Sequence, residues 1–155
     1  MAKTELDRFD HALLGLVQLN NLTPARILAE RVGLSESAVL RRLRRLRKSG
    51  VIMRDVSIVR PASLGRPLTL IVFLSLEHER LSQIEKFIKA LKKRPEVVSA
   101  WYVTGETDFV LLLHLANMAE YQTFTQSVFL SDPNVSRFTT LVSMRQVHST
   151  SYSCT

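Results

Sequence analysis

The N-terminal 50 residues carry apolar side chains at intervals of three and four, the spacing of helices with one buried face. Three such helices follow one another. Thr23 and Pro24 predict the start of the second helix, as N-cap and first helical residue. Asn20 and Asn21 are suited to the turn before it. The apolar faces are formed by Leu6, Phe9, Leu13, Leu16 and Val17; by Ala25, Leu28, Ala29 and Val32; and by Val39, Leu43 and Leu46.

The junction between the second and third helices has the pattern of a helix-turn-helix. Gly33 can take the left-handed conformation that ends a helix, and Ser35 is a natural N-cap for the next one. Ala29, Gly33 and Val39 supply the small residue, turn glycine and β-branched residue that let two helices pack around a tight turn.

A change of period follows. Residues 51–59 are rich in β-branched side chains, which predicts the strands of a wing. Pro61–Pro67 has the proline and glycine content of a linker. We therefore expect a winged helix-turn-helix domain over residues 1–60, a linker over 61–67 and a second domain over 68–155.

In the second domain the apolar period alternates between two and 3.6, which predicts the order βαββαβ. This order is typical of an α+β, ferredoxin-like fold, with a four-stranded antiparallel sheet and both helices on one face. The predicted strands are 68–76, 97–103, 108–115 and 135–147, and the predicted helices are about 81–93 and 118–128.

The strand over residues 68–76 is apolar on both faces. Leu70 and Val72 point one way, while Ile71 and Phe73 point the other. Helices of the same chain can cover only one face, so we expect a second copy to cover the other and form a homodimer. Two-fold symmetry would also supply two recognition helices for DNA half-sites about 34 Å apart or a multiple of that.

Charge is concentrated in the first domain. Residues 1–66 hold 13 Lys and Arg against 6 Asp and Glu, whereas residues 67–155 hold 8 of each. A cationic helix in a helix-turn-helix predicts salt-dependent binding to double-stranded DNA, with Ser35, Ser37 and Arg41 near base edges. A solvated helix surface is the alternative. The full set of candidate DNA contacts is Ser35, Glu36, Ser37, Arg41, Arg42, Arg44, Arg45, Lys48 and Arg54.

The sequence TGETD, Thr104–Asp108, lies between the two middle strands and is a candidate ligand site. Gly105 would let a ligand carboxylate approach backbone N–H groups, and Asp108 or Glu106 would bind its ammonium. An amino acid fits this chemistry. The alternative is an ordinary turn, with a conformational glycine and an aspartate that caps it.

Several of these segments together resemble the Lrp/AsnC regulators of bacteria and archaea: LDRFD at Leu6–Asp10, the stretch Leu28–Leu46, GVI at Gly50–Ile52 and VTGETD at Val103–Asp108. The resemblance implies a transcriptional regulator with an N-terminal winged helix-turn-helix and a C-terminal ligand-binding and oligomerisation domain. It also implies dimers that assemble into tetramers or octamers, and an amino-acid effector bound in the turn region, Thr104, Gly105, Glu106 and Asp108, between dimers.

Other functions have less support from the residues. The four histidines are dispersed without metal-ligand spacing, and the lone Cys154 has no partner, so we expect no metal, no cofactor and no catalytic site. An enzyme remains an alternative, because siroheme decarboxylases resemble Lrp/AsnC proteins. An effector-independent nucleoid-organising protein is a second alternative. No apolar run approaches the roughly 18 residues of a membrane span, and we expect a cytoplasmic, nucleoid-associated protein.

Overall fold

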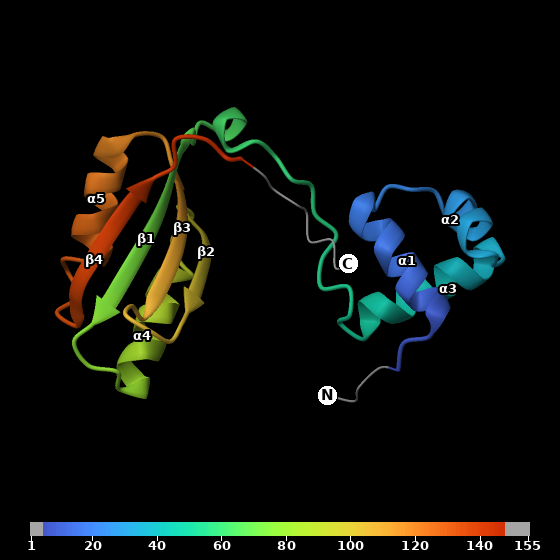
Figure 1. Cartoon of the computed structure of the whole chain (residues 1–155), viewed down its shortest axis with the longest axis horizontal. Helices are drawn as coiled ribbons and strands as arrows, with labels where there is room; N and C mark the ends of the chain where they lie inside the picture. The colour runs from blue at the N-terminus through green and yellow to red at the C-terminus, as the bar shows by residue number, and fades with distance from the viewer. Residues whose placement is uncertain (1–4, 148–155) are drawn as a thin grey trace. The chain divides into compact units, whose positions relative to one another are not determined.

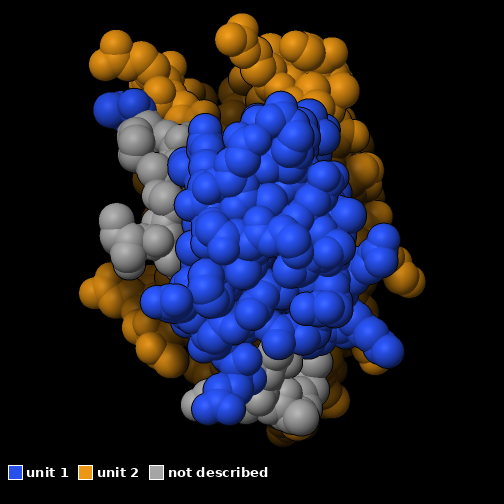
Figure 2. Space-filling view, turned by 90° about the vertical axis from the view of Figure 1, so that its right-hand side faces the viewer, with its two compact units in different colours: residues 1–57, 147–155 blue, residues 58–146 orange. Residues whose placement is uncertain are grey.

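A computed structural model describes residues 5–147 of the chain (Figure 1). They divide into two compact units, one ending at Ser57 and the other spanning Ile58–Gln146 (Figure 2). The elements are α1 Arg8–Leu19, α2 Ala25–Val32, α3 Glu36–Lys48, the short 3-10 helix η1 Pro61–Leu64, β1 Leu68–Leu76, α4 Leu81–Leu91, β2 Val97–Tyr102, β3 Phe109–Leu115, α5 Met118–Val128 and β4 Val135–Val142.

The first unit is a three-helix bundle built around the predicted apolar faces. Its α1 begins with a reciprocal cap, in which Asp7 accepts from the Asp10 N–H and Asp10 accepts from the Asp7 N–H. Gly33 takes the left-handed conformation at the end of α2, and Ser35 caps α3, as predicted. The buried core consists of Leu13, Leu28, Ala29, Val39, Leu43 and Leu46.

The predicted start of α2 is wrong by one residue. Pro24 is the N-cap and has an extended backbone, so that Ala25 is the first helical residue. Thr23 does not cap the helix; its hydroxyl donates to the Asn20 carbonyl at 2.8 Å. Pro24 has a ψ of 144°, outside the helical region, so the helix starts one residue later, and the N–H and hydroxyl of Thr23 both donate to the Asn20 carbonyl of the preceding turn.

The predicted wing strands are absent from the described residues. Residues 53–60 are largely exposed and have no regular secondary structure, although their β-branched content favours strands. A strand needs a partner with which to exchange backbone hydrogen bonds, and this segment has none within the described part of the chain. Its exposed apolar side chains include Met53, Val56, Ile58 and Val59.

The second unit has the predicted βαββαβ order. The sheet is antiparallel, with strand order β2-β3-β1-β4. Helices α4 and α5 pack on the same face, since residues of both helices share one core with the alternate side chains of β1 and β3. This core includes Leu70, Val72, Leu74, Phe87, Leu111, Leu113 and Phe124.

The other face of the sheet is not covered by helices. The register pairs Ile71 with Leu112 and Phe73 with Val110, so these four apolar side chains lie together on it. We call it the open face. Trp101 of β2 pairs with Val110 and extends the apolar surface.

The last strand is shorter than predicted and ends at Val142 rather than Val147. Its partner β1 begins at Leu68, and the last residue pair between them is Leu70 with Val142. The Ser143 N–H still donates to the Thr69 carbonyl at 2.9 Å, but β1 begins at Leu68 and offers no partner to the residues that follow. His148 and Cys154 lie outside the described residues. Within residues 5–147, no helix combines the length and apolar character needed to cross a bilayer.

Candidate functional site

The outward face of α3 is polar and strongly basic. Because Val39, Leu43 and Leu46 are buried, the side chains on the opposite side of the helix face solvent. The Ser35 hydroxyl accepts from the Ala38 N–H at 3.3 Å and lies 3.2 Å from the Ser37 hydroxyl. The exposed candidates are Ser35, Glu36, Ser37, Arg41, Arg44, Arg45, Lys48 and, beyond the helix, Arg54.

Three cations on this face are uncompensated. Arg41, Arg44 and Lys48 form no ion pair with any described residue. They follow one another at three and four residues along α3, a spacing that places them on one side of the helix. Their charges are therefore available to an external anion.

Arg42 and Arg45 are placed differently from these three. Arg42 Nη1 lies 2.7 Å from Asp7 Oδ2 and 2.9 Å from Asp10 Oδ1, and Arg45 Nη2 donates to Asp10 Oδ2. Asp10 is completely buried, whereas the Arg42 side chain is 21% and the Arg45 side chain 47% exposed. The sequence predicted that both arginines contact DNA. In the structure both bind Asp10 of α1, and Arg42 also binds Asp7, the N-cap of that helix.

The pKa values of both aspartates are lowered in this arrangement. Burial raises the pKa of Asp10, but the Asp7 N–H and the guanidinium groups of Arg42 and Arg45 outweigh it, so the pKa is lowered overall. The Asp10 N–H and Arg42 lower the pKa of Asp7 in the same way. The cluster is thus a network of charge-assisted hydrogen bonds that joins α1 to α3.

A second ion pair ties the segment after α3 back to that helix. Arg47 donates to both carboxylate oxygens of Asp55, at 2.8 and 3.1 Å. Hydrogen bonding to Arg47 lowers the pKa of Asp55. Both side chains are 40% exposed, so the pair orients the segment more than it stabilises the fold.

The turn between β2 and β3 holds the predicted ligand residues. Thr104, Gly105 and Glu106 are exposed, and Gly105 has a φ of 134°, which strongly favours glycine. Asp108 is half-buried, and its Oδ2 accepts from the Leu76 N–H at 2.6 Å. One of the two carboxylate oxygens of Asp108 is therefore engaged in a hydrogen bond to the backbone of β1.

Neighbouring strands hold the same turn in place. Thr107 Oγ1 donates to the Leu74 carbonyl at 2.8 Å, and Arg137 Nη2 donates to the Glu106 carbonyl at 2.9 Å. The Glu106 carboxylate forms no ion pair with the described residues. The turn thus has a fixed backbone and one uncommitted acidic side chain.

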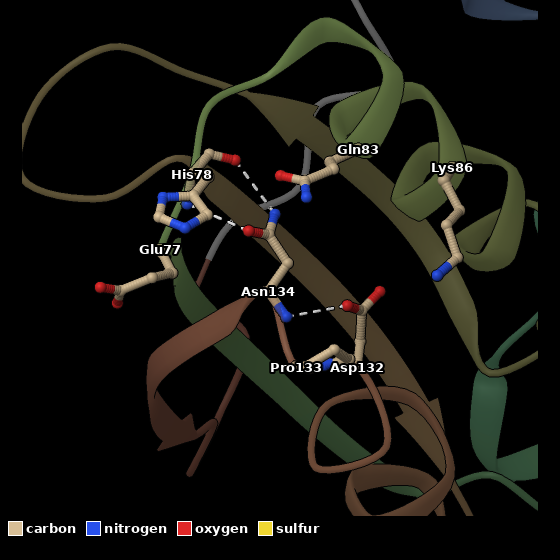
Figure 3. Close-up of a pocket in the computed structure, with 7 residues that line it drawn as sticks. All are labelled: Glu77, His78, Gln83, Lys86, Asp132, Pro133 and Asn134. Carbon is tan, nitrogen blue, oxygen red and sulfur yellow. Dashed lines mark hydrogen bonds between the residues drawn. The ribbon is translucent and has the colours of Figure 1, made fainter.

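A pocket of about 300 Å³ is lined mostly by residues of polar type (Figure 3). Asn134 is buried at its base, where its side chain accepts from the His78 N–H at 3.0 Å and donates to the His78 carbonyl at 3.1 Å. The Gln83 Oε1 is buried without a partner among the described residues. The lining residues are Glu77, His78, Gln83, Lys86, Asp132, Pro133 and Asn134.

The pocket and the β2–β3 turn both bind the end of β1. The Leu76 N–H donates to Asp108 in the turn, and the next residue, Glu77, donates its N–H to the Asn134 carbonyl in the pocket. The sequence did not indicate this pocket, because its residues come from the β1–α4 loop, from α4 and from the α5–β4 loop, which are far apart in the chain. The turn-forming Asp132-Pro133-Asn134 sequence was the available signal.

Family comparisons cover most of the chain. A winged helix-turn-helix DNA-binding model matches residues 6–53, and the Lrp/AsnC ligand binding domain model matches residues 69–152. The chain belongs to the Lrp/AsnC family of transcriptional regulators. The three-helix unit is therefore its DNA-binding part, and the βαββαβ unit is its ligand-binding part.

Relatives along the whole length agree with this assignment. An HTH-type transcriptional regulator of Sinorhizobium fredii is 46% identical, over 94% of this chain and 86% of the relative. A leucine-responsive regulatory protein of Rhizobium meliloti is 32% identical, over 95% and 94%. These relatives are named as regulators and not as enzymes.

Solved structures of the family share the fold. A transcriptional regulator of Neisseria meningitidis in complex with L-methionine superposes with a TM-score of 0.86, at 29% identity over 94% of each chain. An AsnC family regulator from Agrobacterium tumefaciens gives a TM-score of 0.88 at 23% identity, over 96% of this chain and 97% of the other. The α+β fold expected from the sequence is confirmed.

Proposed function

We propose that this Lrp/AsnC regulator reads double-stranded DNA by placing α3 in the major groove. Ser35, Ser37 and Arg41 would approach base edges, while Arg44, Lys48 and Arg54 would neutralise phosphates. The observation that carries the proposal is the uncompensated basic face of α3, opposite a buried apolar face, in a helix-turn-helix.

Replacing Arg41 tests the proposed base contact. Arg41→Ala should weaken binding to the preferred site by about 1–3 kcal/mol, roughly 5- to 150-fold, and reduce discrimination against scrambled DNA. The control is Lys89→Ala, which removes the same charge from an exposed position of α4 in the other unit. Fluorescence anisotropy measures both. Equal affinities for the two variants would contradict a role for Arg41 in recognition.

We further propose that an amino acid binds at the β2–β3 turn. Its carboxylate would meet the backbone around Gly105, and its ammonium would meet Glu106 together with the remaining oxygen of Asp108. The family's ligand-binding domain and the methionine complex of the Neisseria relative support an effector of this class.

Calorimetry with single amino acids tests this site. Glu106→Gln should weaken the binding of whichever amino acid binds the native chain, because it removes a charge while keeping the shape of the side chain. Glu85→Gln, on the exposed surface of α4, is the matched control. Undiminished binding by Glu106→Gln would place the ammonium elsewhere.

The proposed functional unit is a homodimer or a larger assembly of dimers. The open face is apolar at Ile71, Phe73, Val110 and Leu112, and a second copy would cover it and remove this surface from water. An effector bound between subunits would change DNA binding only if its affinity differed between two assemblies.

A further inference from the structure

Asp10 is a buried carboxylate with three donors arranged around it. It accepts from the Asp7 N–H at 3.2 Å, from Arg42 Nη1 at 2.9 Å and from Arg45 Nη2. A buried charge is stable only with such partners, so the carboxylate fixes where the two guanidinium groups lie.

The two arginines differ in exposure and in the number of N–H donors that remain free. Arg42 uses Nη1 for both carboxylates, lies 5.4 Å from the centre of the Phe9 ring and is mostly buried. Arg45 uses Nη2 alone, and its Nε and Nη1 form no hydrogen bond with the described residues. Arg45 is also about half-exposed, and it lies four residues after Arg41 and three before Lys48 on α3.

A guanidinium group has five N–H donors in a rigid plane, so one edge can bind a carboxylate while another binds a phosphate. A free arginine side chain must lose rotamer freedom when it binds an anion. Arg45 has already lost part of that freedom in its contact with Asp10. Its remaining donors are therefore presented from a fixed place beside the basic face.

We propose that Asp10 is a positioning residue for DNA binding, which holds the Arg45 guanidinium so that its free edge contacts a backbone phosphate. This inference rests on the proposed DNA-binding function. Arg42 in the same network then serves to join α1 and α3, and contributes no phosphate contact.

The sign of the effect separates positioning from simple electrostatics. Asp10→Asn removes one negative charge near the DNA, which would strengthen binding if charge alone mattered. Loss of positioning would weaken binding instead. Asp7→Asn is the matched control, because it makes the same charge change at a residue that pairs with Arg42 and not with Arg45. Asparagine is also suited to the N-cap position that Asp7 occupies.

The experiment measures affinity for one DNA duplex over a salt series, with each variant shown by circular dichroism to be folded at the assay temperature. We expect Asp10→Asn to bind about tenfold more weakly, with a salt slope smaller by about 0.9, the loss of one phosphate contact. We expect Asp7→Asn to bind as tightly as the native chain or more tightly. Equal or tighter binding by Asp10→Asn, with an unchanged slope, would overturn the inference.

Arg45→Gln keeps the test decisive if Asp10→Asn does not fold. It should show the same reduction in slope, because the proposal assigns the phosphate contact to Arg45. Where Asp10→Asn does fold, the double variant should lose no more than Arg45→Gln alone. An unchanged slope in Arg45→Gln overturns the inference while leaving the DNA-binding proposal intact. Failure of the native chain to bind DNA at any salt concentration would instead overturn both.

Discussion

Arg41 and Arg45 lie one helical turn apart on α3 and carry the same charge, but their surroundings differ. Arg41 is free of ion pairs among the described residues, whereas Arg45 binds the buried Asp10 of α1. Asp10 thereby joins two functions in one residue. It completes the cap of α1, and it holds two arginine side chains of α3.

Acid should weaken this network. The pKa values of Asp7 and Asp10 are lowered by folding, so their contribution to stability is complete above the ordinary value of 3.8 and is lost as pH falls through the lower folded-state values. Asp10→Asn should lower the unfolding free energy at pH 6 by about 1–3 kcal/mol and flatten the fall in stability below about pH 4.

Urea unfolding between pH 6 and pH 2 measures this difference. Glu30→Gln is the control, because Glu30 forms an exposed pair with Arg26 on α2 that should contribute about 0–1 kcal/mol. Parallel pH curves for Asp10→Asn and the native chain would show that the carboxylate makes no pH-dependent contribution.

The candidate DNA site was predictable only in part, for reasons visible at single residues. Helical periodicity separates Arg41 from the buried Leu43, because both positions follow from the spacing. It cannot reveal that Asp10, 35 residues before Arg45, is a partner. A pairing of that kind depends on how α1 packs against α3.

At the scale of elements, the ends of the strands depend on their partners more than on their own sequence. The run of apolar residues predicted β1 correctly, from Leu68 to Leu76. The β-branched content of residues 51–59 favoured strands that the structure does not contain, and β4 ends at Val142, opposite Leu70 near the start of β1. Propensity identifies a segment that can pair, but only the tertiary structure supplies the pairing.

Two glycines test how elements constrain the backbone. Gly105 has a φ of 134° in the β2–β3 turn, so Gly105→Ala should destabilise the chain by about 1–3 kcal/mol although an added Cβ would meet no atom. Gly15 is exposed inside α1, also with open space, and Gly15→Ala should stabilise it by about 0.5–1 kcal/mol.

Thermal unfolding of both variants measures the predicted loss of stability in Gly105→Ala and the predicted gain in Gly15→Ala. The contrast has a single physical origin, because the two substitutions add the same methyl group to free space and differ only in backbone conformation. Stabilisation by Gly105→Ala would show that the turn relaxes to a conformation open to any residue.

At the scale of the whole molecule, the proposed dimer would connect the open face of the sheet with DNA recognition. Phe73 and Ile71 on this face are apolar, and the helices of the same chain cover the opposite face. One recognition helix reads one half-site, so a symmetric pair of chains would read two. Loss of the dimer should therefore reduce DNA affinity without any change in α3.

Phe73→Asp should produce a folded monomer that binds a two-half-site duplex at least about tenfold more weakly, since a charge on the open face opposes its burial. Gln126→Asp, on exposed α5, adds the same charge outside this face and is the control. Sedimentation velocity gives the assembly and anisotropy the affinity. A dimeric Phe73→Asp variant would exclude the open face as the interface.

We propose, in sum, a DNA-binding regulator that responds to an amino acid. The most direct test measures its binding to the DNA upstream of its own gene and to scrambled DNA, over a salt series, with and without a pool of amino acids. We predict preference for the upstream DNA, steep weakening with salt and a change in affinity with the pool. Binding that ignores both sequence and amino acids would contradict this claim and favour a nucleoid-organising protein, and absence of binding would reopen the enzyme alternative.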